Sequence, residues 1–334
     1  MILTSQDYGQ FLTNSHTNFT GTYFADTVDD LRHDSVYRFL KDNKITPAML
    51  REKVMPGLIE SPDGFVVFDD TVIDKNHSRS IELVRKQYSG NAHRVIRGIG
   101  VVTCLYYNPD VDQFFVLDFR VASIGADGKT KLDHVREMFD GLIERGVQFK
   151  TVLMDTWYAV AWLMRHIDAA NRRYYCPIRK NRKVDDSGGK HKLRPANELE
   201  WDEDELLHGK TVRVSKFALD YRQKLFRVVV SPDRTDLVIT NDLSQDSTDD
   251  VREVHAVRWK IEEFHRELKQ LTGTEDCQAR RQRSQRNHIA MAFMSWFYLK
   301  SAARAAGITI YEQKAAPLRR FVAEQWRNPA TAFE

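Results

Sequence analysis

The feature that most limits the fold is a run of apolar residues that ends in two acids. Residues 65–68 are continuously apolar and are followed by Asp69 and Asp70. An unbroken apolar run of this length predicts a strand that is buried on both faces of a sheet. Residues 149–154 predict another buried strand, which ends at Asp155. The sequence therefore predicts two buried strands that each deliver an acid at their carboxyl end.

The order of the other elements narrows the fold class. Apolar periodicity and turn residues predict strands at residues 101–107 and 114–122, helices at 132–144 and 159–170, and a strand at 174–178. Three strands followed by helix, strand, helix and strand is the succession of the ribonuclease-H-like fold, in which the first and fourth strands are neighbours. We therefore expect an α/β fold with a mixed sheet flanked by helices, in which Asp70 and Asp155 face each other.

Charge gives a weaker indication than the strand pattern. The formal net charge is only +3, but residues 172–194 hold nine Lys or Arg against two Asp, and residues 280–286 form a second basic run without acids. Such blocks are either solvated surface or phosphate-binding sites, and the sequence leaves both open. The candidates for phosphate binding in these blocks are Lys180, Arg182, Arg280 and Arg281.

Several signals that would place the chain elsewhere are missing. The three cysteines are far apart, so neither a disulfide framework nor a zinc site is predicted. The N-terminus has no basic segment followed by an apolar one, so no signal peptide is predicted. The longest mainly apolar run, residues 289–299, is shorter than the roughly 20 residues that a membrane helix needs. We expect a cytoplasmic protein with no membrane partner.

The helix that includes Glu262 can be tested by the angles of its side chains around the axis. At about 100° per residue, Glu262 falls about 40° from Arg258, and Lys269 falls about 20° from it. His265 and Arg266 fall within about 80° of the same reference, whereas the apolar residues occupy another stripe. The helix is therefore expected to present one carboxylate among basic side chains.

Acids at these positions suit one kind of chemistry. Cutting and joining phosphodiester bonds requires an activated nucleophile and a stabilised leaving oxygen, which two divalent ions about 4 Å apart supply. Carboxylate oxygens are suitable ligands for Mg²⁺ or Mn²⁺. Asp70, Asp155 and Glu262 are the acids expected to meet, whereas Trp157 and Trp259 are interpreted as packing residues.

The same residues resemble a known family. The series His255, Arg258, Glu262 and Lys269 is similar to the Y-x2-R-x3-E-x6-K signature of bacterial insertion-sequence DDE transposases, with His255 in place of the tyrosine. Residues 68–71 resemble the first-Asp motif of this family, in which the catalytic Asp precedes Thr, and residues 154–159 resemble the second. The resemblance covers roughly residues 60 to 300.

The resemblance implies the roles of individual residues. Asp70, Asp155 and Glu262 would be the catalytic acids and would hold two Mg²⁺ ions, for which Mn²⁺ substitutes. The residues implied to bind DNA phosphates are Arg258 and Lys269, with His255, His265 and Arg266 as further candidates. Because the charge of an imidazole varies around neutral pH, His255 leaves open whether chemistry at the DNA end follows the family pattern.

Five segments are expected along the chain. They are an N-terminal helical region at residues 1–60, the first part of the catalytic domain at 61–180, a β-rich insertion at 181–249, the second part of the catalytic domain at 250–306 and a C-terminal tail at 307–334. The second catalytic part is expected to hold one long helix at 250–271 and another at 288–306.

Two short helices in the N-terminal region have two interpretations. They form either a helix-turn-helix module or a small helical cap that packs on the next domain, and the sequence leaves both open. The residues that would face DNA in the first interpretation are Ser35, Tyr37, Arg38 and Lys41.

The resemblance implies a transposase that cleaves DNA at transposon ends and joins the ends to target DNA. The partners would be double-stranded DNA and a second copy of the chain, as a homodimer on DNA, in the cytoplasm at the bacterial nucleoid. Two alternatives remain: a metal-dependent nuclease of the same fold without strand transfer, and a domesticated, non-catalytic DNA-binding protein.

Overall fold

The computed structural model describes residues 2–78, 80–90 and 92–330. The chain forms two compact units. Unit 1 comprises Met1–Pro56, Thr71–Val101 and Glu263–Glu334, and unit 2 comprises Gly57–Asp70 and Val102–Glu262. Four elements continue from one unit into the other: η1 (Met55–Gly57), β1 (Phe65–Asp74), β3 (Arg94–Asn108) and α10 (Trp259–Thr272). Both units are therefore built from segments that are far apart in the sequence.

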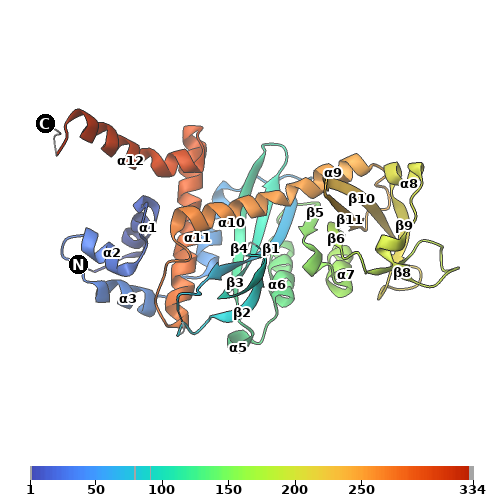
Figure 1. Ribbon diagram of the computed structural model, residues 1–334, viewed down its shortest axis with the longest axis horizontal. Helices are drawn as coiled ribbons and strands as arrows, with labels where there is room; N and C mark the ends of the chain where they lie inside the picture. Colours follow the sequence, from blue (N-terminus) through green and yellow to red (C-terminus); the bar gives the residue numbers. More distant parts are fainter. Residues whose placement is uncertain (1, 79, 91, 331–334) are drawn as a thin grey trace. The chain divides into compact units, whose positions relative to one another are not determined.

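Unit 2 contains most of the strands (Figure 1). Its other elements are β4 (Gln113–Ala122), α5 (Ile124–Asp127), α6 (Lys131–Glu144), β5 (Thr151–Met154), η2 (Thr156–Tyr158), α7 (Ala161–Ala169), β6 (Arg173–Ile178), β7 (Lys183–Asp185), β8 (Arg194–Pro195), η3 (Ala196–Glu198), α8 (Glu203–His208), β9 (Lys210–Val214), β10 (Gln223–Ser231), β11 (Arg234–Thr240) and α9 (Thr248–Val257).

The strands form a mixed sheet. Within the described residues its order is β2-β3-β1-β5-β6-β11-β10-β9-β7-β8, with β2 (Arg85–Ser89) at one end and β4 paired to β3. Strands β1 and β5 are parallel neighbours, from Phe65 opposite Thr151 to Phe68 opposite Met154. This pairing confirms that the first and fourth predicted strands lie side by side. The mixed sheet flanked by helices confirms the predicted fold class.

The strands of the β-rich segment extend this sheet. Strand β11 pairs antiparallel with β6, beginning with Leu237 opposite Ile178, and β10 pairs with both β11 and β9. The β-rich character expected after residue 180 is confirmed. The segment boundaries that the sequence suggested stay predictions.

Two predicted elements differ in extent from the observed ones. The predicted strand at residues 65–68 continues to Asp74, so Asp70 lies inside β1 and not beyond its end. The single helix predicted at 250–271 is two helices, because the backbone tightens at Arg258. There the amide of Arg258 donates to the carbonyl of His255 at 3.2 Å, and the amide of Ile261 donates to the carbonyl of Arg258 at 3.2 Å. Both bonds span three residues, as in a 3₁₀ turn.

Unit 1 is organised around a long helix. Its helices are α1 (Ser5–Asn14), α2 (Gly21–Thr27), α3 (His33–Asp42), α4 (Pro47–Val54), α11 (Gln282–Ala306) and α12 (Ile310–Arg327), with the short η1 (Met55–Gly57) at its boundary with unit 2. Helices α1, α3 and α4 pack against α11 (Figure 1). The side chain of Asn287 accepts from the amide of Ile45 at 2.8 Å and donates to the carbonyls of Leu40 and Asn43. This packing supports the helical-cap interpretation, and DNA contact by α3 stays a prediction.

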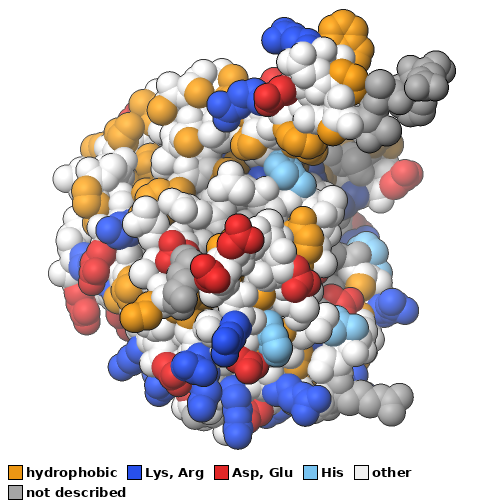
Figure 2. All heavy atoms as spheres, turned by 90° about the vertical axis from the view of Figure 1, so that its left-hand side faces the viewer, with side chains coloured by type: hydrophobic (Ala, Val, Ile, Leu, Met, Phe, Trp, Pro, Cys, Tyr) orange, Lys and Arg blue, Asp and Glu red, His pale blue; other side chains and the backbone are white. Residues whose placement is uncertain are grey.

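The predicted C-terminal tail contains a helix that the sequence interpretation missed. Gly307, with a φ of 65°, ends α11, and Thr309 then caps α12. Lys314 of α12 donates to the carbonyls of Leu12 and Thr13 of α1 at 2.8 and 2.9 Å. Figure 2 shows hydrophobic side chains on the segment that leads to the grey C-terminal residues. The exposed apolar residues of α12 are Leu318, Phe321, Val322 and Trp326. Residues 331–334 of the predicted tail lie outside the described residues.

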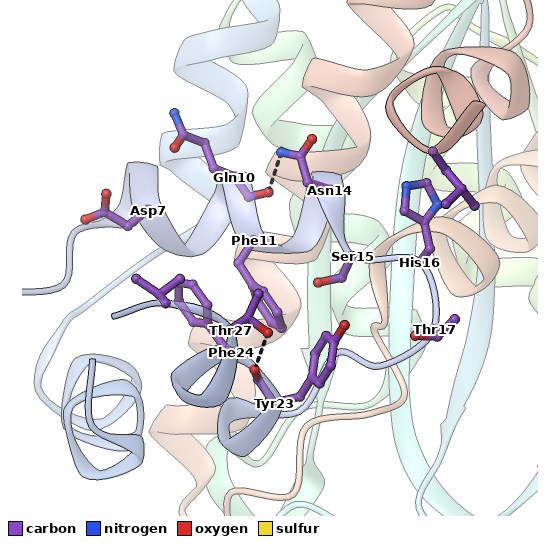
Figure 3. Close-up of a pocket in the computed structure, with 12 residues that line it drawn as sticks. Asp7, Gln10, Phe11, Asn14, Ser15, His16, Thr17, Tyr23, Phe24 and Thr27 are labelled. Carbon is purple, nitrogen blue, oxygen red and sulfur yellow. Dashed lines mark hydrogen bonds between the residues drawn. The ribbon is translucent and has the colours of Figure 1, made fainter. Parts of the chain in front are cut away.

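A pocket of about 540 Å³ lies among α1, α2 and the following loop (Figure 3). Phe11 and Phe24 stack in its wall with ring centroids 4.2 Å apart. Two of its polar side chains bond to the backbone of their own helices, Asn14 to Gln10 and Thr27 to Tyr23. The lining holds one acid, Asp7, and its carboxylate caps α1. The pocket therefore lacks the acid cluster that phosphodiester chemistry requires.

Among the described helices, none is long and apolar enough to cross a membrane.

We predict that the stability of the protein falls on mild acidification. Burial lowers the pKa of His265 and of His288 to about 3, with smaller contributions from the charges of Lys269 and Lys75. Nε2 of His288 donates to the carbonyl of Gly273 and Nδ1 accepts from Tyr8, so the folded state holds the neutral ring. An unfolded histidine takes up a proton below about pH 6.5, so the unfolded chain binds more protons than the folded one. The free energy of unfolding therefore decreases as the pH is lowered. The expected loss between pH 7 and pH 5 is about 2 kcal/mol per histidine.

Urea unfolding followed by circular dichroism at the two pH values measures this loss. A double variant, His265→Gln with His288→Gln, should show a flatter pH dependence, whereas substitution of the exposed His33 should leave it unchanged. An unchanged dependence in the double variant would contradict the prediction.

Candidate active site

Two acids follow the paired stretch of the central strands, Asp69 within β1 and Asp155 directly after β5. The pairing ends with Phe68 opposite Met154, and Asp69 and Asp155 are the residues that follow these two. Residues in register on parallel strands point to the same face of a sheet. Asp155 keeps an extended backbone, with φ −78° and ψ 165°. Asp69 thus has the same offset from the paired residues as Asp155, whereas the side chain of Asp70 points to the opposite face of β1 from that of Asp69.

Electrostatics agrees with this arrangement. Desolvation raises the pKa of Asp69 to about 8, and the negative charges of Asp70 and Asp155 contribute to the increase. The positive charge of Arg258 acts in the opposite direction. Asp69 also accepts a hydrogen bond from the amide of Asp70 at 2.8 Å. Burial and the neighbouring acids therefore both disfavour the charged form of Asp69.

Asp70, which the sequence interpretation chose as the first catalytic acid, is engaged by two other side chains. The ammonium of Lys131 lies 2.5 Å from its Oδ2, and the hydroxyl of Tyr158 donates to its Oδ1 at 2.6 Å. Burial, with the charges of Asp70 and Asp69, raises the pKa of Tyr158 well above 10, so the phenol remains a donor. Trp157, predicted to be packed, is 43% exposed and lies edge-on to Tyr158.

Glu262 is connected to the Asp69 side through an arginine. Oε1 of Glu262 lies 2.8 Å from Nη1 of Arg258, whose side chain is only 9% exposed. This is the guanidinium whose charge acts on Asp69. Trp259, also expected to pack, is instead 53% exposed at the start of α10. The described contacts thus connect Asp69, Arg258 and Glu262 in one electrostatic network.

A further ion-pair network joins β11 to α9. Arg234 donates from Nε and Nη2 to the two carboxylate oxygens of Asp236, at 3.1 and 2.7 Å. Nε2 of His255 lies 3.1 Å from the same carboxylate. Burial acts to raise the pKa of Asp236, but the hydrogen bonds from His255 and Arg234 hold it well below the ordinary value. The buried ring of His255 therefore faces Asp236 in this conformation, and not the phosphate contact expected from the sequence.

The other basic residues expected to bind phosphate differ in exposure. In unit 2, Lys180 is exposed, whereas Arg182 donates to the carbonyl of Ser215 at 3.3 Å, and burial lowers its pKa. Arg182 is thus partly occupied within the protein, whereas Lys180 is accessible to a ligand.

The corresponding residues of unit 1 fall into the same two groups. Lys269 donates to the carbonyl of Val72 at 2.7 Å and pairs with Glu275 at 3.1 Å. His265 is buried, which removes it from contact with a phosphate in this conformation. The exposed members are Arg266, Arg280 and Arg281, the last of which pairs with Glu82 at 3.1 Å.

The functional residues that the sequence interpretation passed over had local signals. Asp69 and Asp155 both come directly after four residues that pair in register, an offset that can be counted once the two strands are aligned. Arg234 and Asp236 are two residues apart on a strand, which places opposite charges on one face. Lys131 is the first residue of α6, where a cation opposes the helix dipole and so needs another reason for its position.

The donor set fits a hard divalent cation. The acids at this end of the sheet offer only carboxylate oxygens. Burial raises the pKa of Asp69 most, and the charges of Asp70 and Asp155, which a cation would offset, add to the increase. Within the described residues, no three His, Cys, Asp or Glu side chains are close enough to hold one ion together. Glu262 in particular bonds to Arg258, so it would have to exchange this partner for a metal.

Comparison with known proteins identifies the family. A family model described as Transposase DDE domain matches residues 60–298. The search of curated proteins returned no match. Among solved structures, endonuclease V of Ciona intestinalis, in complex with a 24mer DNA containing an inosine followed by a ribo-adenosine, aligns with a TM-score of 0.29 at 9% identity, over 66% of this chain and 95% of that chain.

A variant of the same enzyme with a 23mer DNA aligns with a TM-score of 0.27 at 9% identity, over 62% of this chain and 85% of that chain. The family match covers most of the chain and includes Asp69, Asp70, Asp155 and the helix that carries Glu262. The chain therefore belongs to the transposase DDE domain family.

Proposed function

We propose that this protein is a cut-and-paste transposase that cleaves DNA at transposon ends and transfers the ends to target DNA. Its family implies a nucleic-acid-cleaving enzyme that binds DNA and depends on divalent metal. The observation that carries the proposal is the register of β1 with β5, because Asp69 and Asp155 directly follow the last paired residues, Phe68 and Met154. The link from Asp69 through Arg258 to Glu262 supports the same site.

The acids proposed to hold metal are Asp155, Glu262 and one member of the Asp69–Asp70 pair. Register and electrostatics favour Asp69, whereas Asp70 already has Lys131 and Tyr158 as partners. Carboxylate donors alone suit Mg²⁺, with Mn²⁺ as a substitute. Two such ions, when bound, would activate the attacking oxygen and stabilise the leaving oxygen.

Basic side chains of the protein are proposed to hold the DNA backbone. Arg258 forms an ion pair with Glu262, and a metal bound at Glu262 would release the guanidinium of Arg258 for a phosphate. Exposed cations, among them Lys180, Arg266 and Arg280, are available for weaker contacts with the duplex. Lys269 would have to leave the carbonyl of Val72 to contribute.

The finer parts of the biological setting are also proposals. Pairing two transposon ends favours a homodimer on double-stranded DNA, as the family resemblance implies. Action on DNA of this kind places the protein in the bacterial cytoplasm, at the nucleoid.

A strand-transfer assay tests the proposed function. The purified protein is incubated with a pre-cleaved transposon end, a target plasmid and Mg²⁺ or Mn²⁺, and we expect covalently joined product that disappears on chelation of the metal. Hydrolysis without joined product would support a metal-dependent nuclease of the same fold. DNA binding without either reaction would support a non-catalytic DNA-binding protein.

A further inference from the structure

We propose that Arg234 is a phosphate-binding residue of the active site, and that Asp236 and His255 are the positioning residues that hold it there. This inference rests on the proposed function, because it assigns a DNA contact to the same site. It concerns a residue outside the signature that the sequence suggested.

The topology brings Arg234 to the correct end of the sheet. Strands β5 and β6 are parallel, so their carboxyl ends lie at one edge, where Asp155 follows β5. Strand β11 runs antiparallel to β6 and its pairing begins with Leu237 opposite Ile178, the last residue of β6. The residues of β11 that precede Leu237, including Arg234, therefore extend past that same edge.

One edge of the Arg234 guanidinium is bonded to a carboxylate, and that carboxylate is in turn bonded to a histidine. Nε and Nη2 of Arg234 bond to both oxygens of Asp236, whose side chain is 15% exposed. His255, 6% exposed, bonds to Oδ2 of Asp236 from α9. Arg258 and Glu262 follow His255 by three and seven residues, about one and two helical turns. The histidine thus ties the tip of the β10–β11 hairpin to the segment that carries the third acid.

Two of the proposed catalytic acids act electrostatically on Arg234, in addition to Asp236. Its pKa is raised first by the hydrogen bond to Asp236, and then by the negative charges of Asp236, Asp155 and Glu262. Two acids that are far apart in the sequence therefore act on this one guanidinium. A cation in this position would offset the negative charge that a scissile phosphate adds to that of the acids.

The remaining donors of Arg234 suit a phosphate. A guanidinium has five N–H donors, and the two bonds to Asp236 use two of them. Half of the side chain is exposed, so a ligand can reach the others. Arginine binds phosphate through paired donors, and a guanidinium already fixed by a carboxylate loses little freedom on binding. The network also gives a reason for histidine in place of the signature tyrosine, because the imidazole bonds to Asp236.

The test compares Arg234→Gln with Arg227→Gln. Arg227 is an exposed arginine on the same hairpin, so it controls for the loss of one positive charge. Binding of a transposon-end duplex is measured over a range of salt with Ca²⁺ present, and cleavage with Mg²⁺. Arg234→Gln should reduce the slope of log K against log salt by about one, and slow cleavage by about a hundredfold. Arg227→Gln should change cleavage less than about threefold.

The positioning residues have a different expected signature. Asp236→Asn and His255→Gln leave the Arg234 charge in place, so kcat should fall about tenfold while the salt slope stays that of the wild type. Arg234→Lys should restore the slope but not the full cleavage rate, because an ammonium lacks the planar pair of donors. Melting temperatures of all variants are compared so that misfolding is recognised.

The outcomes separate the inference from the proposed function. If the wild type does not cleave DNA but Arg234→Gln still lowers the salt slope, the inference stands and the proposed activity is wrong. If the wild type cleaves and joins DNA but Arg234→Gln behaves like Arg227→Gln, the inference is overturned and the proposed activity stands.

Discussion

The Asp155→Asn variant is expected to lose DNA cleavage, with the rate falling by at least about a thousandfold. Asp155 follows Met154, the last residue of β5, which pairs with the residue before Asp69 on the neighbouring strand. An amide keeps the shape of the side chain but removes the negative charge that binds a divalent ion. Cleavage of an end-labelled transposon-end duplex measures the loss. DNA affinity should stay within about threefold of that of the wild type, since the substitution removes a negative charge that repels phosphate and no group that binds it.

Matched substitutions decide whether the effect belongs to the site. Asp204→Asn, at an acid whose side chain is 84% exposed on α8, should leave cleavage unchanged. Asp69→Asn should be as severe as Asp155→Asn, and Asp70→Asn should slow cleavage only about tenfold, through loss of the Lys131 partner. Cleavage by Asp155→Asn at the wild-type rate would remove the proposed site. A severe effect at Asp70 with a mild one at Asp69 would return the first acid to Asp70.

The parts of the fold that could be predicted are those that depend on local pattern. The mainly apolar segments before Asp69 and Asp155 predicted β1 and β5, because strands buried on both faces are rich in apolar residues. Their order among the other elements then predicted that they would be neighbours, which the parallel pairing confirms. The angular spacing after Arg258 also predicted that Glu262 lies on the same side of the helix, where the structure shows the two as an ion pair.

The parts that could not be predicted depend on contacts between distant segments. The choice between Asp69 and Asp70 reverses if a strand register shifts by one residue, and register is set by pairing with β5. His255 fits a signature position, yet its ring bonds to Asp236, which is 19 residues earlier on another element. The exposure of Trp157 and Trp259 likewise depends on what packs nearby, because their residue type alone favours burial.

Gly273→Ala is expected to destabilise the protein by about 3 kcal/mol or more, enough to leave a substantial fraction of the molecules unfolded. Gly273 follows α10 with a φ of 61°, a conformation in which a side chain is strained. A Cβ there would lie 2.1 Å from Cγ and 2.2 Å from Cβ of Phe19, and the Cβ of a buried residue cannot move without its backbone. The carbonyl of Gly273 also accepts from His288, so a shift of this turn would break a buried hydrogen bond.

Gly307→Ala separates the two causes of this loss. Gly307 has a similar φ of 65°, but a Cβ there would meet no described atom within 4 Å. Its substitution therefore carries only the backbone strain, and should lower stability by about 1 kcal/mol. Urea unfolding of both variants, with soluble expression as a second readout, measures the difference. Equal effects at the two positions would mean that backbone strain alone sets the loss, and that the turn after α10 can move away from Phe19.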